Sequence, residues 1–114
     1  MTYYLIAGER SGDLHAGNLI SAISKIDSNA EVRAWGGENV EKAGANLVVH
    51  YKEIAVMGFL EVLKQFNKIK RFLKLCKDDI TEYQPDVVIL VDFGGFNLRI
   101  AKFCKKNGIR VYYY

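Results

Sequence analysis

The residues of this chain that are best suited to chemistry lie in two glycine-rich segments, one near each end. The first segment is Ala7-Gly-Glu-Arg-Ser-Gly-Asp13, and it precedes a helical pattern, so its backbone N–H groups could hold an anion. It is neither GxGxxG nor a P-loop, and Glu9 and Asp13 would repel a pyrophosphate. Acidic and hydroxyl groups at this place suit sugar hydroxyls better. A tight turn with Asp13 as the helix N-cap is the alternative interpretation.

The second segment is Val91-Asp-Phe-Gly-Gly-Phe-Asn97, directly after an unbroken apolar run. Such a run is typical of a strand buried on both faces of a parallel sheet. Asp92 is then expected at the carboxyl edge of that sheet, where partial desolvation would make it a usable general base. Gly94 and Gly95 would let a substrate approach the backbone closely. The alternative is that Asp92 only caps the following helix.

Short β-rich runs alternate with helical patterns along the chain. The predicted strands are 3–7, 31–35, 47–50, 86–91 and 110–114, and the predicted helices are 14–26, 40–43, 59–83 (one helix or two) and 96–106. This order predicts an α/β fold with a doubly wound parallel sheet of strand order 3-2-1-4-5. Ligands of such sheets bind where the first and fourth strands meet, which would bring the two glycine-rich segments into one crevice.

The stretch 59–77 predicts a helix with two different faces. One stripe is apolar and predicts the core side. The opposite side mixes basic and apolar residues, which suits an anionic membrane surface, although a solvated face with scattered apolar residues is the alternative. Lys70 and Lys77 fall toward the core stripe, which predicts a bend or break. The residues predicted to face a membrane are Leu60, Lys64, Lys68, Arg71, Phe72 and Leu75.

Composition limits the remaining possibilities. The chain has 114 residues, half of them hydrophobic, and a net charge of +3, which predicts one globular domain and does not indicate nucleic acid binding. Cys76 and Cys104 are interpreted as reduced core thiols, and His15 and His50 as structural. We expect no metal and no cofactor. The absence of a signal-peptide pattern and of an apolar run of about 20 residues predicts a cytosolic protein.

Four stretches together resemble the lipid-A-disaccharide synthase family, which are inverting glycosyltransferases of the two-domain GT-B type. The loop AGERSGD and the stretch IAVMGFLEVL are specific as a pair. The four stretches are 7–13, Gly36-Gly37 together with Ala43-Gly44, 54–63, and 85–98. The match spans nearly the whole chain.

The resemblance implies a reaction and a set of site residues. The family joins UDP-2,3-diacylglucosamine to 2,3-diacylglucosamine 1-phosphate, giving a β-1,6-linked disaccharide 1-phosphate and UDP. Asp92 matches the family's essential aspartate, the proposed general base for the acceptor's 6-hydroxyl. The residues implied to contact substrate are Gly8, Glu9, Ser11, Gly12, Asp13, Met57, Gly58 and Asn97.

The resemblance also implies an organisation and a location. Residues 1–114 would be a Rossmann-like, acceptor-side N-terminal domain, the front half of a GT-B fold. The donor-binding C-terminal domain is missing, so we expect the chain by itself not to turn over. The final strand at 110–114 has no following helix, which predicts a fragment or a partner at this end. The protein is expected at the cytoplasmic face of the inner membrane of a Gram-negative bacterium.

The sequence departs from the family pattern in two segments. Gly94 and Gly95 replace a proline and a second aspartate, and residues 37–40 read GENV instead of GPRM.

Two other functional hypotheses are considered. The second hypothesis, a plain nucleotide-binding module, would need an acid at the end of the second strand, where the sequence has Gly36 and Gly37 instead. The third hypothesis is a membrane-docking module without chemistry.

Overall fold

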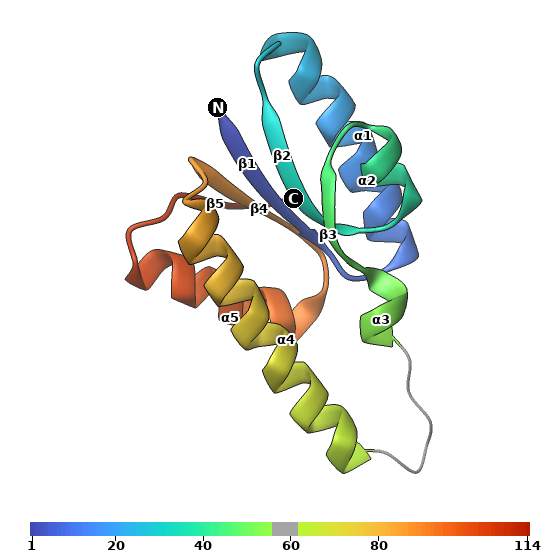
Figure 1. Cartoon of the computed structure of the whole chain (residues 1–114), viewed down its shortest axis with the longest axis vertical. Helices are drawn as coiled ribbons and strands as arrows, with labels where there is room; N and C mark the ends of the chain where they lie inside the picture. The colour runs from blue at the N-terminus through green and yellow to red at the C-terminus, as the bar shows by residue number, and fades with distance from the viewer. Residues whose placement is uncertain (56–61) are drawn as a thin grey trace.

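The computed structural model describes the backbone of residues 1–55 and 62–114, and the side chains of 1–54 and 67–114. The strands are β1 (Thr2–Ala7), β2 (Glu31–Gly36), β3 (Asn46–His50), β4 (Val87–Val91) and β5 (Val111–Tyr113). The helices are α1 (Arg10–Ile26), α2 (Glu38–Lys42), α3 (Tyr51–Ala55), α4 (Val62–Tyr83) and α5 (Gly94–Lys106). Figure 1 shows their arrangement around one sheet.

The sheet is parallel throughout, with the order β3-β2-β1-β4-β5. This confirms the predicted doubly wound fold. Its strand order reverses between β1 and β4, which are far apart in the sequence but pair from Tyr3 with Val87 to Ala7 with Val91. The carboxyl ends of these two strands therefore lie side by side, and the loops that follow them leave the sheet at the same edge (Figure 1).

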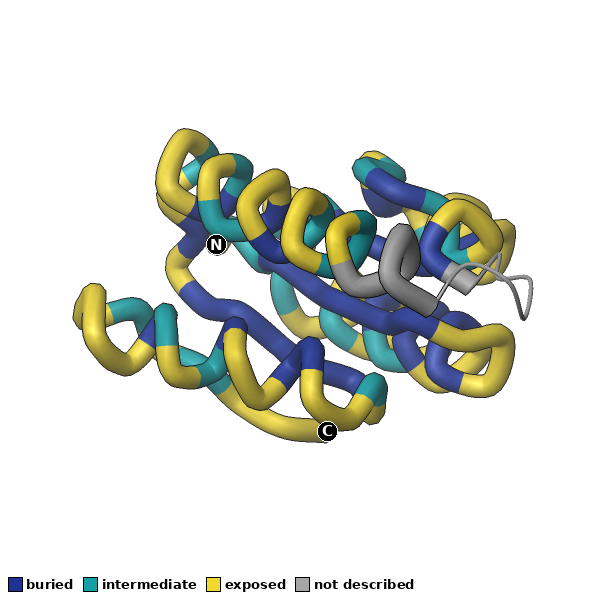
Figure 2. Tube along the Cα trace, turned by 90° about the horizontal axis from the view of Figure 1, so that it is seen from below, coloured by how far each residue is buried: buried dark blue, intermediate teal, exposed yellow. Residues whose placement is uncertain are grey.

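Two apolar cores lie on the two faces of the sheet. Alternate residues of β1 divide between them: Tyr4 and Ile6 face the core under α4 and α5, and Leu5 and Ala7 face the core under α1 and α2. All five residues of β4 are buried, because helices cover the sheet on both sides (Figure 2). Double burial is the physical reason for the unbroken apolar run at 87–91.

Several predicted boundaries differ from the structure. α1 begins at Arg10 rather than residue 14, α2 begins at Glu38, and α3 was not predicted. The predicted bend or break near Lys70 and Lys77 is wrong for the described span, since α4 is one helix from Val62 to Tyr83. Lys77 is half-buried beside the core, and its ammonium lies 5.8 Å from the centre of the Phe103 ring of α5, a favourable placement for a cation.

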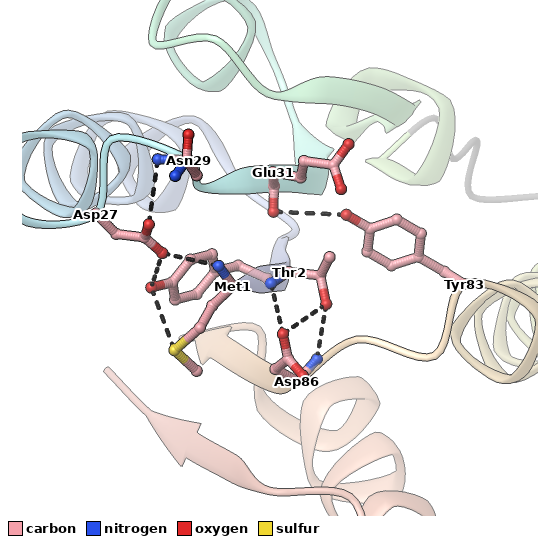
Figure 3. A network of polar contacts seen from close by, with 8 residues as sticks. Met1, Thr2, Asp27, Asn29, Glu31, Tyr83 and Asp86 are labelled. Atoms are coloured by element: carbon pink, nitrogen blue, oxygen red, sulfur yellow. Dashed lines mark hydrogen bonds and ion pairs between the residues drawn. The ribbon is translucent and has the colours of Figure 1, made fainter.

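A polar network fastens the sheet edge opposite the two glycine-rich loops (Figure 3). The Asp27 carboxylate accepts hydrogen bonds from the Met1 ammonium at 3.0 Å and from the Tyr3 hydroxyl at 3.1 Å. The Asp86 carboxylate accepts from the backbone N–H of Thr2 at 2.7 Å and from its hydroxyl at 3.0 Å. These contacts tie the start of β1 to the end of α1 and to the start of β4.

A second network fixes α4 to the sheet. Asp79 of α4 accepts two hydrogen bonds from Arg33, at 2.7 and 2.8 Å, and one from the Tyr4 hydroxyl at 2.7 Å. The Trp35 indole donates to the same hydroxyl at 2.8 Å. Burial opposes ionisation of Asp79, but the hydrogen bonds from Arg33 and Tyr4 outweigh it and lower the pKa of this carboxyl. Asp79 therefore stabilises the fold in its ionised form.

We expect Asp79→Asn to lower the free energy of unfolding at neutral pH by about 2 kcal/mol, less than for a fully buried pair because Arg33 is 35% exposed. Because the folded-state pKa lies below the usual 3.8, this contribution is present above that value and is lost as the pH falls through the folded value. Urea unfolding of both proteins between about pH 6 and pH 3 measures it.

The matched control is Asp78→Asn, one position earlier on the exposed side of α4, where Asp78 pairs with Lys74. It should change stability by less than about 0.5 kcal/mol. Parallel acid dependence in the wild type and Asp79→Asn would contradict the role given to Asp79.

Candidate functional site

The two glycine-rich segments meet at the carboxyl edge of the sheet, between β1 and β4. The ring of Phe93 lies against Gly8 so closely that a Cβ on Gly8 would overlap it. On the same edge, a Cβ on Gly12 would lie 3.6 Å from a methyl carbon of Val91. The juxtaposition that the topology predicted is therefore present, and the contact of Phe93 with Gly8 depends on the absence of a side chain at Gly8.

The backbone after β4 forms an unusual left-handed turn. Asp92, Phe93 and Gly94 have φ values of +49°, +61° and +33°, a region in which residues with a Cβ each lose roughly 1–2 kcal/mol. The turn is held by its neighbours, since the Asp92 carbonyl accepts from Asn97 Nδ2 at 2.7 Å and from the Tyr113 hydroxyl at 3.0 Å. Strain that neighbouring contacts maintain is typical of functional sites.

Asn97 is the residue that joins the two strand ends. It is fully buried, and its Nδ2 donates to the Ile6 carbonyl of β1 at 3.3 Å as well as to the Asp92 carbonyl. Its Oδ1 has no hydrogen-bond partner among the described residues. Asn97 therefore positions the backbone of Asp92 in this structure, and its predicted contact with substrate stays a prediction.

The side chain of Asp92 is exposed at this edge. The alternative that it caps α5 is wrong, because the N-cap residue is Phe93 and makes no side-chain cap hydrogen bond. The expected partial desolvation is not provided by the described residues either. A Cβ at Gly94 or Gly95 would meet nothing within 4 Å, so the start of α5 is open to an approaching molecule, as predicted.

The first loop adds exposed polar groups beside this turn. Glu9, Arg10 and Ser11 are exposed and line a shallow hollow together with Leu14 and Asn39. Glu9 is the N-cap residue of α1 but its side chain makes no cap hydrogen bond. Phe93 at the start of α5 makes no side-chain cap hydrogen bond either, so among the described residues both helix starts favour negative charge at this edge.

Asp13 does not have the predicted role of N-cap to α1. It lies inside the first turn of α1, is 1% exposed, and caps α2 instead. Its carboxylate accepts from the N–H groups of Gly37 at 2.7 Å, Asn39 at 3.1 Å and Val40 at 3.1 Å, and from Asn39 Nδ2 at 2.9 Å. With four donors already bound, the carboxylate shapes the site by fixing α2 against α1.

Met57 and Gly58, two of the predicted substrate contacts, lie outside the described residues. Of the predicted membrane-facing set, Leu60 also lies outside them, and Lys64 is described in its backbone only. The placement of Phe72 on the outer face is wrong: its ring packs edge-on against Trp35, with centroids 5.9 Å apart. Arg71 and Leu75 are exposed as predicted, and Lys68 is half-buried with its ammonium 6.0 Å from the Phe72 ring.

Other predictions concern thiols, histidines and membrane spans. Cys76 and Cys104 are buried free thiols, as predicted, and burial raises the pKa of Cys104 to about 11. His50 contacts Glu38 at 3.3 Å and accepts from the N–H of Lys52 at 3.1 Å, which is a structural role. Within residues 1–55 and 62–114, no helix is long and apolar enough to cross a bilayer, and no cluster of three or more acidic, histidine or cysteine side chains could hold a metal.

Sequence reasoning missed two residues of the site. Phe93 covers Gly8. Its position in the sequence, between Asp92 and Gly94 of the second glycine-rich segment, was the signal that could have identified it as a site residue. Tyr113 supports the turn from β5, and no local pattern distinguishes it from its tyrosine neighbours.

Comparison with known proteins identifies what this arrangement is similar to. A family model described as lipid-A-disaccharide synthetase matches residues 3–114. Lipid-A-disaccharide synthases from Coxiella burnetii (strain RSA 331 / Henzerling II) and Trichlorobacter lovleyi are 38% identical over 110 residues and 41% identical over 111 residues. Each alignment covers 96% of this chain and 29% of the relative, so the chain spans under a third of their length.

Solved structures share the fold at low sequence identity. A putative UDP-N-acetylglucosamine 2-epimerase from Listeria monocytogenes aligns with a TM-score of 0.68 at 12% identity, covering 98% of this chain and 29% of that one. A UDP-GlcNAc 2-epimerase from Neisseria meningitidis, bound to UDP-GlcNAc, aligns with a TM-score of 0.63 at 10% identity, covering 99% and 32%.

We expect Gly8→Ala to destabilise the chain by roughly 2 kcal/mol and to displace Phe93, because the added methyl group overlaps its ring. Urea unfolding gives the stability, and amide chemical shifts of residues 92–97 report the turn. Gly95→Ala is the control, since its methyl group enters open space. Equal effects of the two substitutions would contradict the contact between the loops.

We expect Asp13→Asn to cost about 3 kcal/mol, because an amide NH₂ would face backbone N–H donors that the carboxylate now satisfies. Urea unfolding measures the loss, and weakened protection of the α2 amides from hydrogen exchange locates it. Glu9→Gln, in the exposed loop, should leave both unchanged. Wild-type protection of α2 in Asp13→Asn would show that the cap is unimportant.

Proposed function

Because the chain belongs to the lipid-A-disaccharide synthetase family, we propose that it forms the acceptor-side domain of a hexosyltransferase that acts on acylated glucosamines. The donor is UDP-2,3-diacylglucosamine and the acceptor is 2,3-diacylglucosamine 1-phosphate. The products are the β-1,6-linked disaccharide 1-phosphate and UDP. The observation that carries the proposal is the exposed carboxylate of Asp92 on a strained turn where β1 and β4 meet.

Asp92 is the proposed general base. Its carboxylate takes the proton of the acceptor's 6-hydroxyl as that oxygen attacks the anomeric carbon of the donor. The bond from the anomeric carbon to the UDP oxygen breaks, and UDP leaves with the electron pair. Attack from the face opposite UDP inverts the anomeric centre, which agrees with a β-linked product.

The turn that carries Asp92 would aim this base. Two hydrogen bonds on the Asp92 carbonyl and the packing of Phe93 on Gly8 fix the backbone, so little rotational freedom is left to lose on binding. Gly95 leaves the first turn of α5 without an acidic residue. Proton transfer in this chain therefore depends on Asp92 without the second aspartate of many family members.

The first loop is the proposed binding site for sugar hydroxyls. Glu9 and Ser11 are exposed beside the turn, and carboxylate and hydroxyl oxygens can accept hydrogen bonds from a sugar. Gly8 and Gly12 let this loop lie close to β4, and Asp13 holds α2 behind it. Met57 and Gly58 are proposed to complete the site through the segment that leads into α4.

The donor nucleotide is proposed to bind mainly to a second domain. The chain covers 29% of the relatives, and residues 1–114 by themselves are expected to give no turnover. A second domain closing over the edge would also exclude water from Asp92, which is exposed here, and so make it a stronger base.

The lipid substrates imply work at a bilayer, at the cytoplasmic face of the inner membrane. Arg71 and Leu75 are exposed on the outer side of α4, and with Lys68 they keep the basic and apolar character predicted for a membrane-facing surface.

The test is a chimera in which residues 1–114 replace the matching segment of the Trichlorobacter lovleyi relative, assayed for disaccharide 1-phosphate with detergent-dispersed substrates. We expect turnover from the chimera, none from residues 1–114 by themselves, and a loss of at least about 100-fold in kcat for Asp92→Asn, as for removal of a general base. Asp78→Asn, which removes an exposed carboxylate of α4, should keep full activity. Full activity of Asp92→Asn would refute the role of the base, and an inactive but folded chimera would refute the function.

A further inference from the structure

Charge is divided very unevenly over the fold. The chain as a whole carries +3. α4 contains six cationic and three acidic residues, and α5 contains four cationic residues and no acidic one, so the two helices together carry +7 and the rest of the chain carries −4. Both helices cover the same face of the sheet, so one layer of the molecule is strongly positive and the opposite layer is not (Figure 1).

The cations of this layer converge on a groove between α4 and α5. Six basic residues line the groove, and its acidic residue is Asp78, which pairs with Lys74 at 2.7 Å. Lys77 is held over the Phe103 ring at the groove floor. The basic residues are Lys70, Lys74 and Lys77 from α4, and Arg99, Lys102 and Lys106 from α5.

We propose that this groove binds the phosphate headgroups of an anionic phospholipid bilayer and so docks the layer of α4 and α5 on the membrane. Phosphate oxygens are the complementary ligands for a groove of lysines with an arginine. An anionic bilayer surface attracts basic clusters of this size. The inference rests on the proposed function only in the choice of a bilayer, where acylated sugars would be presented.

Two observations favour a bilayer over a nucleic acid. Leu98 of α5, next to the groove residue Arg99, is 56% exposed, and an exposed leucine among cations suits the boundary between headgroups and acyl chains. Nucleic acid grooves use open aromatic faces for base stacking. Phe103, the aromatic residue of this groove, is half-buried and lies beneath the Lys77 ammonium.

The groove is separate from the membrane-facing set predicted on α4. At 100° per residue, Arg71 and Lys68 lie on the opposite flank of α4 from Lys70 and Lys77. The proposal therefore assigns α5 a direct part in docking, and it tilts the bound domain so that the layer of α1 and α2 points away from the bilayer.

The experiment is flotation of the chain with phosphatidylcholine vesicles, with and without phosphatidylglycerol. The groove variant combines Arg99→Gln, Lys102→Gln and Lys106→Gln, all exposed residues of α5. The control variant combines Lys25→Gln, Lys42→Gln and Lys52→Gln, which removes the same charge from exposed sites elsewhere. Circular dichroism checks that both variants fold.

We expect binding of the wild type only to vesicles that contain phosphatidylglycerol, and a loss of at least about 10-fold in the partition coefficient for the groove variant. The control variant should stay within about threefold of the wild type. Equal losses in both variants, no vesicle binding by the wild type, or displacement from vesicles by an RNA oligonucleotide would each overturn the proposal. The activity assay of the chimera uses detergent-dispersed substrates, so any of these results would leave the proposed reaction standing.

Discussion

The pairing of β1 with β4 is the contact on which the rest of this molecule depends. These strands are separated by most of the chain, yet they pair in parallel from Tyr3 with Val87 to Ala7 with Val91. Asn97 closes the end of the pair, since its amide group donates to the carbonyl of Ile6 within β1 and to the carbonyl of Asp92 directly after β4. The two loops then occupy one place, and Phe93 can rest on Gly8 only because that position has no side chain.

The edge of the sheet where β1 begins and the edge where β1 and β4 end have different structural roles. At one edge, Asp27 and Asp86 accept hydrogen bonds that fasten the start of β1 (Figure 3). At the other edge, hydrogen bonds hold Asp92 and Phe93 in left-handed conformations that cost free energy. The stabilising contacts at the first edge offset the free-energy cost of the strained turn at the second edge. That turn, together with two helix starts whose cap residues make no side-chain hydrogen bond, offers features that a ligand can use.

The two helical layers differ in a similar way. The carboxylate of Asp13 turns inward to cap α2, so the first layer uses an acid to join two helices. The second layer directs its charges outward, apart from Asp79, which meets Arg33 and Tyr4 at the sheet. This division keeps the edge where β1 and β4 end apart from the positive face of α4 and α5, so the two surfaces need not use the same residues.

The sequence by itself determined the fold class, the strand order and the meeting of the two loops, because burial on both faces of β4 and the rules of parallel crossovers leave a pattern in one dimension. It also placed Asp92 at the carboxyl edge of the sheet, because a polar residue directly after a strand buried on both faces must lie there. Only the tertiary structure decided what the side chains there do. Asp13 found donors on α2 rather than on its own helix, Phe72 turned to Trp35, and Tyr113 reached Asp92 from another strand. Each of these contacts involves a partner that is distant in the sequence. The local spacing of residues therefore could not predict them.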